Sequence, residues 1–197
     1  KNRIHSNFAQ DVTTTGRLSS SNPNLQNIPI RSELGRRIRE GFVAKKGNLL
    51  VSADYSQFEL RLAAVLANDK PLIETFEKDL DIHAKTASEV FGVPIDEVSK
   101  EQRRVAKIIN FSVLYGVGAH NLSGTIGVGF YEAKKYIEEY FNAHKPIREL
   151  MDRTLEKAQD EGYVETFFGR RRPMPDIKSS NFMIREMARR AAQNMPI

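Results

Sequence analysis

Residues 49 to 61 read Leu49-Leu50-Val51-Ser52-Ala53-Asp54-Tyr55-Ser56-Gln57-Phe58-Glu59-Leu60-Arg61, and this stretch decides the fold. Its apolar start at 49–51 predicts a strand, joined by a turn at 45–48 to an earlier strand at Phe42-Val43. From Phe58 onward the apolar residues recur at the spacing of an amphipathic helix. We therefore expect a hairpin, a carboxylate at its tip in Asp54, and a helix that leaves from it.

The sequence on either side of this stretch differs in kind. Residues 1–40 are rich in Ser, Thr, Asn and Gly, which favours loop and turn. From Pro71 onward the pattern is almost wholly helical, in segments 71–79, 83–91, 99–115, 130–144, 146–161 and 181–194, with a small hairpin at 163–175. Ser99 with Gln102 has the spacing of a capping box, and Asn181 is an expected N-cap. The sequence thus predicts an α+β fold, with a mostly helical part attached to an antiparallel sheet.

The composition narrows the class of protein. The 197 residues carry a net charge of +5, no cysteine and no apolar run long enough to span a membrane, so we expect no disulfide, zinc site or membrane partner. The basic residues gather in clusters, which favours a polyanionic partner such as nucleic acid. These clusters are Arg36, Arg37 and Arg39; Arg103, Arg104 and Lys107; Arg170 to Arg172; and Arg185, Arg189 and Arg190. A merely solvated surface stays open as the alternative.

Two local patterns suggest chemistry. A carboxylate at a strand end, as expected for Asp54, suits a hard cation such as magnesium, although an N-cap for the next helix is the alternative. Farther along, Arg103, Lys107, Phe111 and Tyr115 are spaced by four and so share one helix face. Two cations followed by two rings can hold a triphosphate and stack a base, although packing plus solvated charge explains the same face.

These segments resemble the motifs of family A (polymerase I-like) DNA polymerases over nearly the whole chain. The string from Asp54 to Arg61 resembles motif A, and Arg103-x3-Lys107-x3-Phe111-x3-Tyr115-Gly116 resembles motif B in the right order. The resemblance implies part of a palm antiparallel sheet with a mostly helical fingers subdomain. It divides the chain into a palm segment at 1–68, fingers at 69–180, and a helix returning toward the palm at 181–197.

The resemblance also implies roles for individual residues near the nucleotide. Asp54 and the carbonyl of Tyr55 would hold two magnesium ions (Mg2+), and Lys107 would be catalytic as a proton donor to the pyrophosphate. Glu59 would block the sugar 2′ position. The expected contacts of the deoxynucleoside triphosphate (dNTP) are Tyr55, Ser56, Gln57, Glu59, His83, Arg103, Lys107, Phe111 and Tyr115.

Other segments match the parts of the family that touch DNA. The segments 15–20 and 24–29 resemble the loop at the primer–template minor groove, which makes Arg17, Gln26 and Asn27 expected contacts. Arg190 is expected to approach the template. The implied partners are primer–template DNA and dNTP, with no oligomer, in a cytoplasmic setting of bacterial or phage type.

Activity is a separate expectation. The family takes a second catalytic carboxylate from a His-Asp-Glu motif that lies beyond the Asn194-Met195-Pro196 segment, and this sequence has no such motif. We therefore expect these residues alone to be inactive. Two alternatives stay open: a nucleotide-binding or nucleic-acid-binding module without chemistry, and a single-subunit RNA polymerase, which has no need of a sugar-excluding glutamate.

The glycines at 116–129 lack the order of a phosphate loop, and we expect helix ends and turns there.

Overall fold

The computed structural model describes residues 3–30 and 32–197. The chain forms two compact units, Lys1–Tyr55, here called the N-terminal unit, and Ser56–Ile197, here called the helical unit. Helices dominate, and two short antiparallel ladders accompany them, one in each unit. The predicted α+β class is confirmed.

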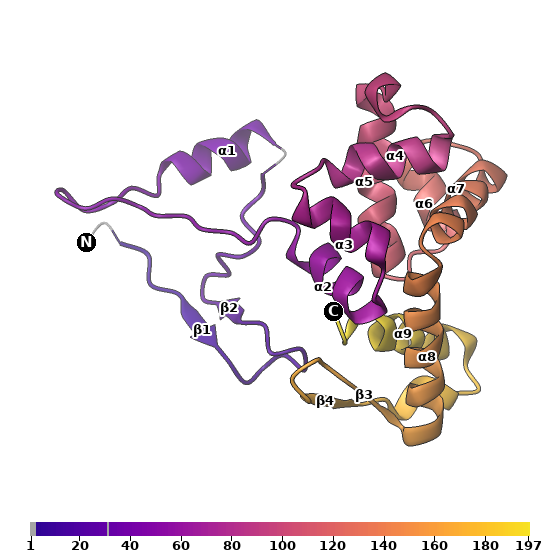
Figure 1. The fold of residues 1–197 in the computed structure, drawn as a ribbon. Helices are drawn as coiled ribbons and strands as arrows, with labels where there is room; N and C mark the ends of the chain where they lie inside the picture. The colour runs from indigo at the N-terminus through magenta and orange to yellow at the C-terminus, as the bar shows by residue number, and fades with distance from the viewer. Residues whose placement is uncertain (1–2, 31) are drawn as a thin grey trace. The chain divides into compact units, whose positions relative to one another are not determined.

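In the described residues of the N-terminal unit, 3–30 and 32–55, there is one ladder and one helix (Figure 1). Strands β1 (Asn7–Ala9) and β2 (Ser19–Ser21) pair with Phe8 opposite Ser20, and helix α1 spans Glu33–Glu40. Helix α1 begins where the Ser32 hydroxyl accepts a hydrogen bond from the Gly35 amide at 3.1 Å. A Cβ on Gly35 would lie 2.3 Å from the Pro29 carbonyl oxygen, so only glycine fits there. The prediction of loop throughout residues 1–40 is therefore wrong at α1, where a local cap starts a helix despite the polar composition.

The predicted strands at 42–43 and 49–51 are also wrong. The turn between them exists, since the Asn48 amide donates to the Lys45 carbonyl at 2.9 Å, but no ladder flanks it in the described residues. Val43, Leu49 and Val51 are 78%, 89% and 89% exposed. A strand needs a hydrogen-bonded neighbour and a surface on which to bury its apolar face, and this unit supplies neither. Asp54 consequently lies on an irregular segment and not at a strand tip.

The helical unit follows the predicted segments closely. Its elements are α2 (Phe58–Ala67), α3 (Lys70–Glu77), α4 (Ile82–Phe91), η1 (Ile95–Glu97), α5 (Lys100–Leu114), α6 (Ala119–Ile126), α7 (Phe130–Ala143), α8 (Lys145–Glu161), β3 (Tyr163–Glu165), β4 (Arg171–Pro173), η2 (Pro175–Lys178) and α9 (Phe182–Asn194). The hairpin pairs Val164 with Arg172. Helix α6 lies among the glycines that were expected only to end helices, and Gly118 and Gly127 do cap it.

Local capping explains where several helices begin and end. The Ser99 hydroxyl accepts from the Gln102 amide while the Gln102 side chain accepts from the Ser99 amide, which confirms the capping box of α5. The Asn181 side chain accepts from the amides of Met183 and Ile184 at the start of α9. These caps fix the register of α5 and therefore the direction in which its side chains point.

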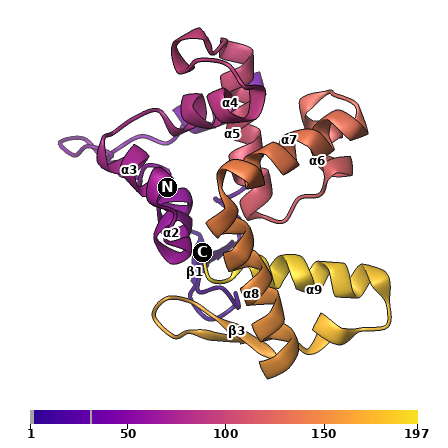
Figure 2. The same ribbon diagram turned by 45° about the vertical axis from the view of Figure 1, so that its right-hand side comes forward.

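Two apolar clusters hold the helical unit together. The larger is built from α2 to α8, and α5 contributes Val105, Ile109 and Val113 to it. The smaller joins α8, the β3–β4 hairpin, η2 and α9. Helix α4 lies along α5, and α9 lies beside α8 (Figure 1, Figure 2). Because α5 buries one side, its other side is left free to carry function.

Candidate functional site

The free side of α5 carries the predicted row of cations and rings. Arg103 and Lys107 are exposed, Phe111 is half-buried, and Tyr115 is 39% exposed at the C-terminal end of the helix. The spacing of four residues places them along one face, as the sequence predicts. The row therefore runs from positive charge at the N-terminal end of α5 to aromatic surface at the other.

Helix α4 adds an acidic anchor to this row. Asp81 is the N-cap of α4, and its Oδ1 accepts from the amides of His83 and Ala84 at 3.0 and 3.1 Å. Its Oδ2 accepts from Arg103 Nε at 2.6 Å. Burial alone raises the pKa of Asp81, but the hydrogen bonds from Arg103 and Ala84, with the charge of Arg103, outweigh burial and lower it. One carboxylate thus starts α4 and holds a cation of α5.

His83 lies inside this arrangement. It is 3% exposed, its ring centre is 6.1 Å from that of Phe111, and its Nδ1 is 3.2 Å from Asn110 Nδ2. Burial lowers the pKa of His83, and the charges of Arg103 and Lys107 lower it further against the opposing effect of Asp81. The structure therefore places the predicted histidine beside the row on α5, in surroundings that favour its neutral form.

The far end of the row is tied to α2 and approached by α9. The Tyr115 hydroxyl donates a hydrogen bond to the Glu59 carboxylate, which joins two residues that the sequence assigned to the sugar and template positions. Gly116 follows with φ 64°, and a Cβ there would lie 2.6 Å from Gln193 Oε1 and 3.3 Å from Arg190 Cγ. Arg190 thus stands beside the turn that ends α5.

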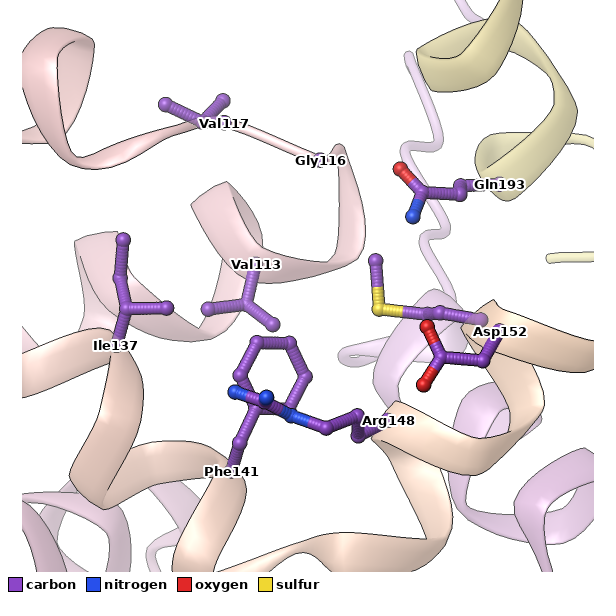
Figure 3. Close-up of a pocket in the computed structure, with 9 residues that line it drawn as sticks. Val113, Gly116, Val117, Ile137, Phe141, Arg148, Asp152 and Gln193 are labelled. Atoms are coloured by element: carbon purple, nitrogen blue, oxygen red, sulfur yellow. The ribbon is translucent and has the colours of Figure 1, made fainter. Parts of the chain in front are cut away.

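A cavity of about 300 Å³ opens behind the same turn (Figure 3). Its lining comes from the end of α5 and from α7, α8 and α9, and the Arg148 guanidinium lies 4.2 Å from the centre of the Phe141 ring at its wall. Close packing elsewhere holds α5 against its neighbours, whereas this side of the turn borders free space. The Tyr115–Gly116 end has room that the buried middle of the helix lacks.

The remaining predicted residues lie in or at the edge of the N-terminal unit. Arg17, Gln26 and Asn27 are exposed on its loops. The Ser20 hydroxyl accepts from the Leu25 amide at 3.1 Å, and the Gln26 side chain donates to the Leu18 carbonyl at 3.1 Å, so this loop has a defined shape. Asp54 and Tyr55 are exposed at the end of the unit, and Ser56 and Gln57 begin the next.

Asp54 and its neighbouring carbonyls are oxygen donors, which suits a hard cation chemically. No group of three His, Cys, Asp or Glu side chains that would bind a metal occurs in residues 3–30 and 32–197. The donor set fits an ion that also binds water and phosphate oxygens, as magnesium does. The convergence of Asp54 with Arg103 and Lys107 on one triphosphate stays a prediction, because these residues belong to different units.

The residues that support the row were not predicted from the sequence. Asp81, Thr86 and Asn110 were not among the predicted site residues. The signal for Asn110 is an amide on the apolar side of α5, among Val105, Ile109 and Val113, where it is 1% exposed. A buried amide needs hydrogen-bond partners, and this need points toward a polar neighbour on the facing helix.

Comparison with known proteins gives the family to which this arrangement belongs. The family model for DNA polymerase family A matches residues 1–197, and the chain belongs to that family. It is 51% identical over 195 residues to the thermostable DNA polymerase I of Thermus aquaticus and 52% identical over 195 residues to DNA polymerase I of Pseudomonas aeruginosa. The match covers 99% of this chain but 23% and 21% of those proteins.

A solved structure gives the same result. The polymerase domain of Pol1 from M. smegmatis, in complex with DNA primer-template and dNTP, matches with a TM-score of 0.88 and 45% identity. The match covers 98% of this chain and 34% of that one. In the part of the chain that the structure describes, no helix is long and apolar enough to cross a membrane.

Proposed function

We propose that the chain forms the nucleotide-binding part of a DNA-directed DNA polymerase, which adds a dNTP to a primer 3′-hydroxyl with loss of pyrophosphate. The observation that carries this proposal is the row on α5, with Asp81 and His83 of α4 beside its cationic end. The triphosphate lies along Arg103 and Lys107, and the base stacks at Phe111 and Tyr115. The relatives named DNA polymerase I support the same activity.

The cations at the start of the row neutralise the charge that builds on the leaving pyrophosphate. Lys107 is exposed and carries no ion pair in the described residues, so it is available to give that group a proton. Proton donation by a positioned side chain contributes roughly 100-fold to 10,000-fold to a rate. Arg103, whose Nε is bound to Asp81, serves as a fixed charge.

Asp54 and the Tyr55 carbonyl would hold two magnesium ions. When bound, such ions lower the pKa of the attacking hydroxyl and stabilise the leaving oxygen. Ser56 and Gln57 continue from this site, and Gln57 takes a left-handed backbone conformation (φ 53°) that turns the chain into α2. This turn precedes Glu59 by half a helical turn and so fixes the direction of its side chain.

Glu59 selects deoxyribose because its carboxylate fills the space of a 2′-hydroxyl. Its hydrogen bond from Tyr115 holds the carboxylate in place, which supports the assignment. Replacing Glu59 by Ala is expected to raise ribonucleotide incorporation. Unchanged incorporation would contradict the sugar assignment and favour an RNA polymerase.

The DNA contacts are proposed from position. Arg17, Gln26 and Asn27 lie exposed on a shaped loop and would meet the primer–template minor groove. Arg190 would approach the template beside Gly116, where α9 meets the end of α5. The palm segment at 1–68, the fingers at 69–180 and the returning helix at 181–197 belong to the same proposal.

The experiment is a chimera in which this chain replaces the matching 195 residues of the Thermus aquaticus enzyme. We expect magnesium-dependent primer extension that is lost in the Asp54→Asn variant. The Asp176→Asn variant is the control and should keep this activity, because Asp176 is an exposed residue of η2 and not one of the proposed site residues. The 197 residues alone, assayed in parallel, are expected to be inactive. A chimera that binds dNTP and DNA but extends no primer would favour the binding module.

A further inference from the structure

A buried polar group links α4 to α5 behind the cationic end of the row. It consists of His83, Thr86 and Asn110, which are 3%, 0% and 1% exposed. The Thr86 hydroxyl donates to Asn110 Oδ1 at 3.2 Å, and Asn110 Nδ2 donates to the Thr86 oxygen at 3.1 Å. Asn110 Nδ2 also lies 3.2 Å from His83 Nδ1.

Because the amide nitrogen of Asn110 is the atom that faces the ring, this geometry points to the position of a proton. An amide nitrogen is a donor and never an acceptor, so the ring nitrogen that faces Asn110 must accept. A neutral imidazole that accepts at Nδ1 carries its proton on Nε2. Nε2 has no hydrogen-bond partner within the described part of the chain, so its N–H remains available.

We propose that Asn110 is a positioning residue whose amide holds His83 in the tautomer protonated on Nε2, so that His83 donates a hydrogen bond to the triphosphate. The inference rests on the proposed function and adds to it the group that orients the histidine. Phosphate oxygens are acceptors, and the opposite tautomer would present a lone pair to them. Tautomer choice matters here because His83 is neutral before the nucleotide arrives: burial, with Arg103 and Lys107, lowers its pKa.

The alternative is that Asn110 turns its amide oxygen, and not its nitrogen, toward His83. In that case Nδ1 would carry a proton, in either the neutral tautomer protonated on Nδ1 or the imidazolium ring, and would donate to that oxygen. The two readings therefore differ in one observable quantity, the protonation of each ring nitrogen. This quantity can be measured in the native chain without nucleotide.

The test is 15N NMR of the imidazole nitrogens in the intact 197-residue chain. The chain has only four histidines, His5, His83, His120 and His144, and a His83→Gln variant assigns the signals. At a pH where His83 is neutral, we expect Nε2 to carry the proton and Nδ1 to carry none. A proton on Nδ1 of neutral His83 overturns the proposal.

Inorganic tripolyphosphate then serves as the ligand probe. We expect it to shift the Nε2 signal of His83, and a dNTP to do the same. If His83 carries its proton on Nε2 but neither probe shifts the signal, the tautomer assignment stands. The hydrogen bond from His83 to phosphate and the proposed nucleotide site are then both overturned. A shift together with a proton on Nδ1 would overturn the tautomer alone.

Asn110→Asp tests causation, because it keeps the shape of the side chain and exchanges a donor for an acceptor. We expect Nδ1 of His83 to gain a proton and, at a pH where the ring is neutral, tripolyphosphate to bind about tenfold or more weakly, as for a lost hydrogen bond to a charged group. Asn121→Asp adds the same charge at an exposed site on α6 and is expected to change binding less than twofold, a limit of roughly 0.4 kcal/mol. If Asn110→Asp keeps both the tautomer and the affinity of the native chain, Asn110 does not position His83.

Discussion

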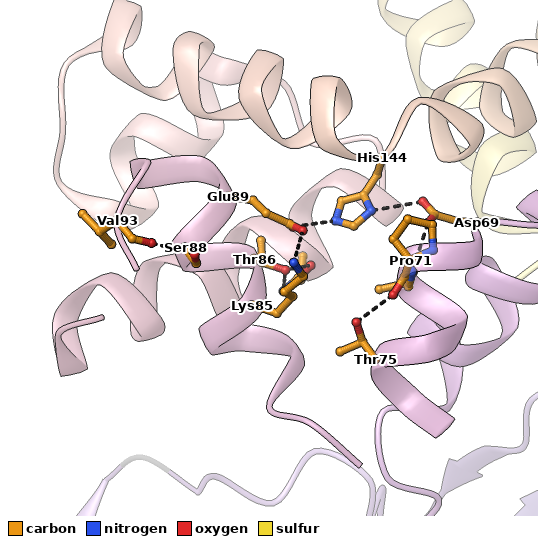
Figure 4. A network of polar contacts seen from close by, with 11 residues as sticks. Asp69, Pro71, Thr75, Lys85, Thr86, Ser88, Glu89, Val93 and His144 are labelled. Carbon is orange, nitrogen blue, oxygen red and sulfur yellow. Dashed lines mark hydrogen bonds and ion pairs between the residues drawn. The ribbon is translucent and has the colours of Figure 1, made fainter. Parts of the chain in front are cut away.

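Two histidines of the helical unit are both almost fully buried, yet their surroundings shift their pKa values in opposite directions. His83 is 3% exposed and lies near Arg103 and Lys107, whereas His144 is 1% exposed and lies between Asp69 and Glu89 (Figure 4). Burial lowers the pKa of both. At His144 the two carboxylates outweigh burial and raise the pKa to about 9, while at His83 the two cations add to its effect.

The net charge around each histidine indicates the role of its surroundings. His144 sits at the joint of α7 and α8, and its charge together with that of Lys85 is balanced within the protein by Asp69 at the start of α3 and Glu89 of α4. At the row on α5, the carboxylate of Asp81 faces two cations, so positive charge is left over. A site whose charges already cancel holds helices together, and a site with an excess of one sign awaits a partner of the other sign.

The largest expected effect comes from removing the charge at the balanced site. His144→Phe keeps a ring of similar size but leaves Asp69, whose side chain is 1% exposed, buried without its partner. Breaking a buried pair in this way costs about 3–5 kcal/mol. Urea unfolding of the native chain and the variant measures this loss.

A second variant separates lost charge from lost packing. Asp69→Asn in the His144→Phe background removes the unpaired charge and keeps an oxygen that can accept from the Leu72 amide. We expect it to recover much of the lost stability. A loss below about 1 kcal/mol in the single variant, which is the size of an exposed pair, would contradict the charged state of His144.

The next effect is on the dependence of stability on pH. The groups that face His144 are Asp69, Glu89 with Lys85, and Tyr140, whose pKa is raised by burial and by the two carboxylates. A raised folded-state pKa gives stability that is fully present below the unfolded value near 6.5 and is lost as pH rises through about 9. The shift corresponds to roughly 3 kcal/mol.

His83 has the opposite sign, since its lowered pKa gives stability that is present above 6.5 and lost on acidification. Unfolding free energies measured from about pH 5 to about pH 10 are expected to decline at both ends. The alkaline decline should disappear in His144→Phe, and the acidic contribution of His83 should disappear in His83→Gln. An alkaline decline of equal size in His144→Phe would assign it to another group.

These contrasts mark the limit of what the sequence alone predicts. Apolar periodicity and caps predicted α5, α8 and α9, because a helix is set by residues close in sequence. The hairpin at 42–51 was predicted from composition and is wrong, since pairing depends on a neighbour that the residues themselves do not specify. The row on α5 was predicted by its spacing, but the contact of Asn110 with His83 joins two helices and becomes visible only when they pack.

A smaller effect is expected at the anchor of the row. Asp81→Asn should keep the cap of α4, because an asparagine, Asn181, caps α9 in the same way. The substitution removes the negative charge that holds Arg103. Arg103 and Asp81 are 48% and 42% exposed, so the pair contributes about 0.2–1 kcal/mol, and tripolyphosphate binding should weaken only a few-fold. Calorimetric titration measures the affinity. Glu101→Gln, which breaks the Arg104 pair on the same helix, is the control and should leave affinity unchanged.

The smallest effect is expected at the edge of the balanced site. Lys85 Nζ lies 3.2 Å from Glu89 Oε1, with the two side chains 39% and 20% exposed, so Lys85→Gln should cost only about 0.3–0.5 kcal/mol and the loss should shrink in high salt. The same change leaves His144 between its two carboxylates, and its NMR signal should still report a charged ring at neutral pH. If Lys85→Gln instead destabilises the chain as much as His144→Phe does, charge balance at this site depends on all four groups together. The comparison would then be between His83 and a network of four charged groups, and not between His83 and His144 alone.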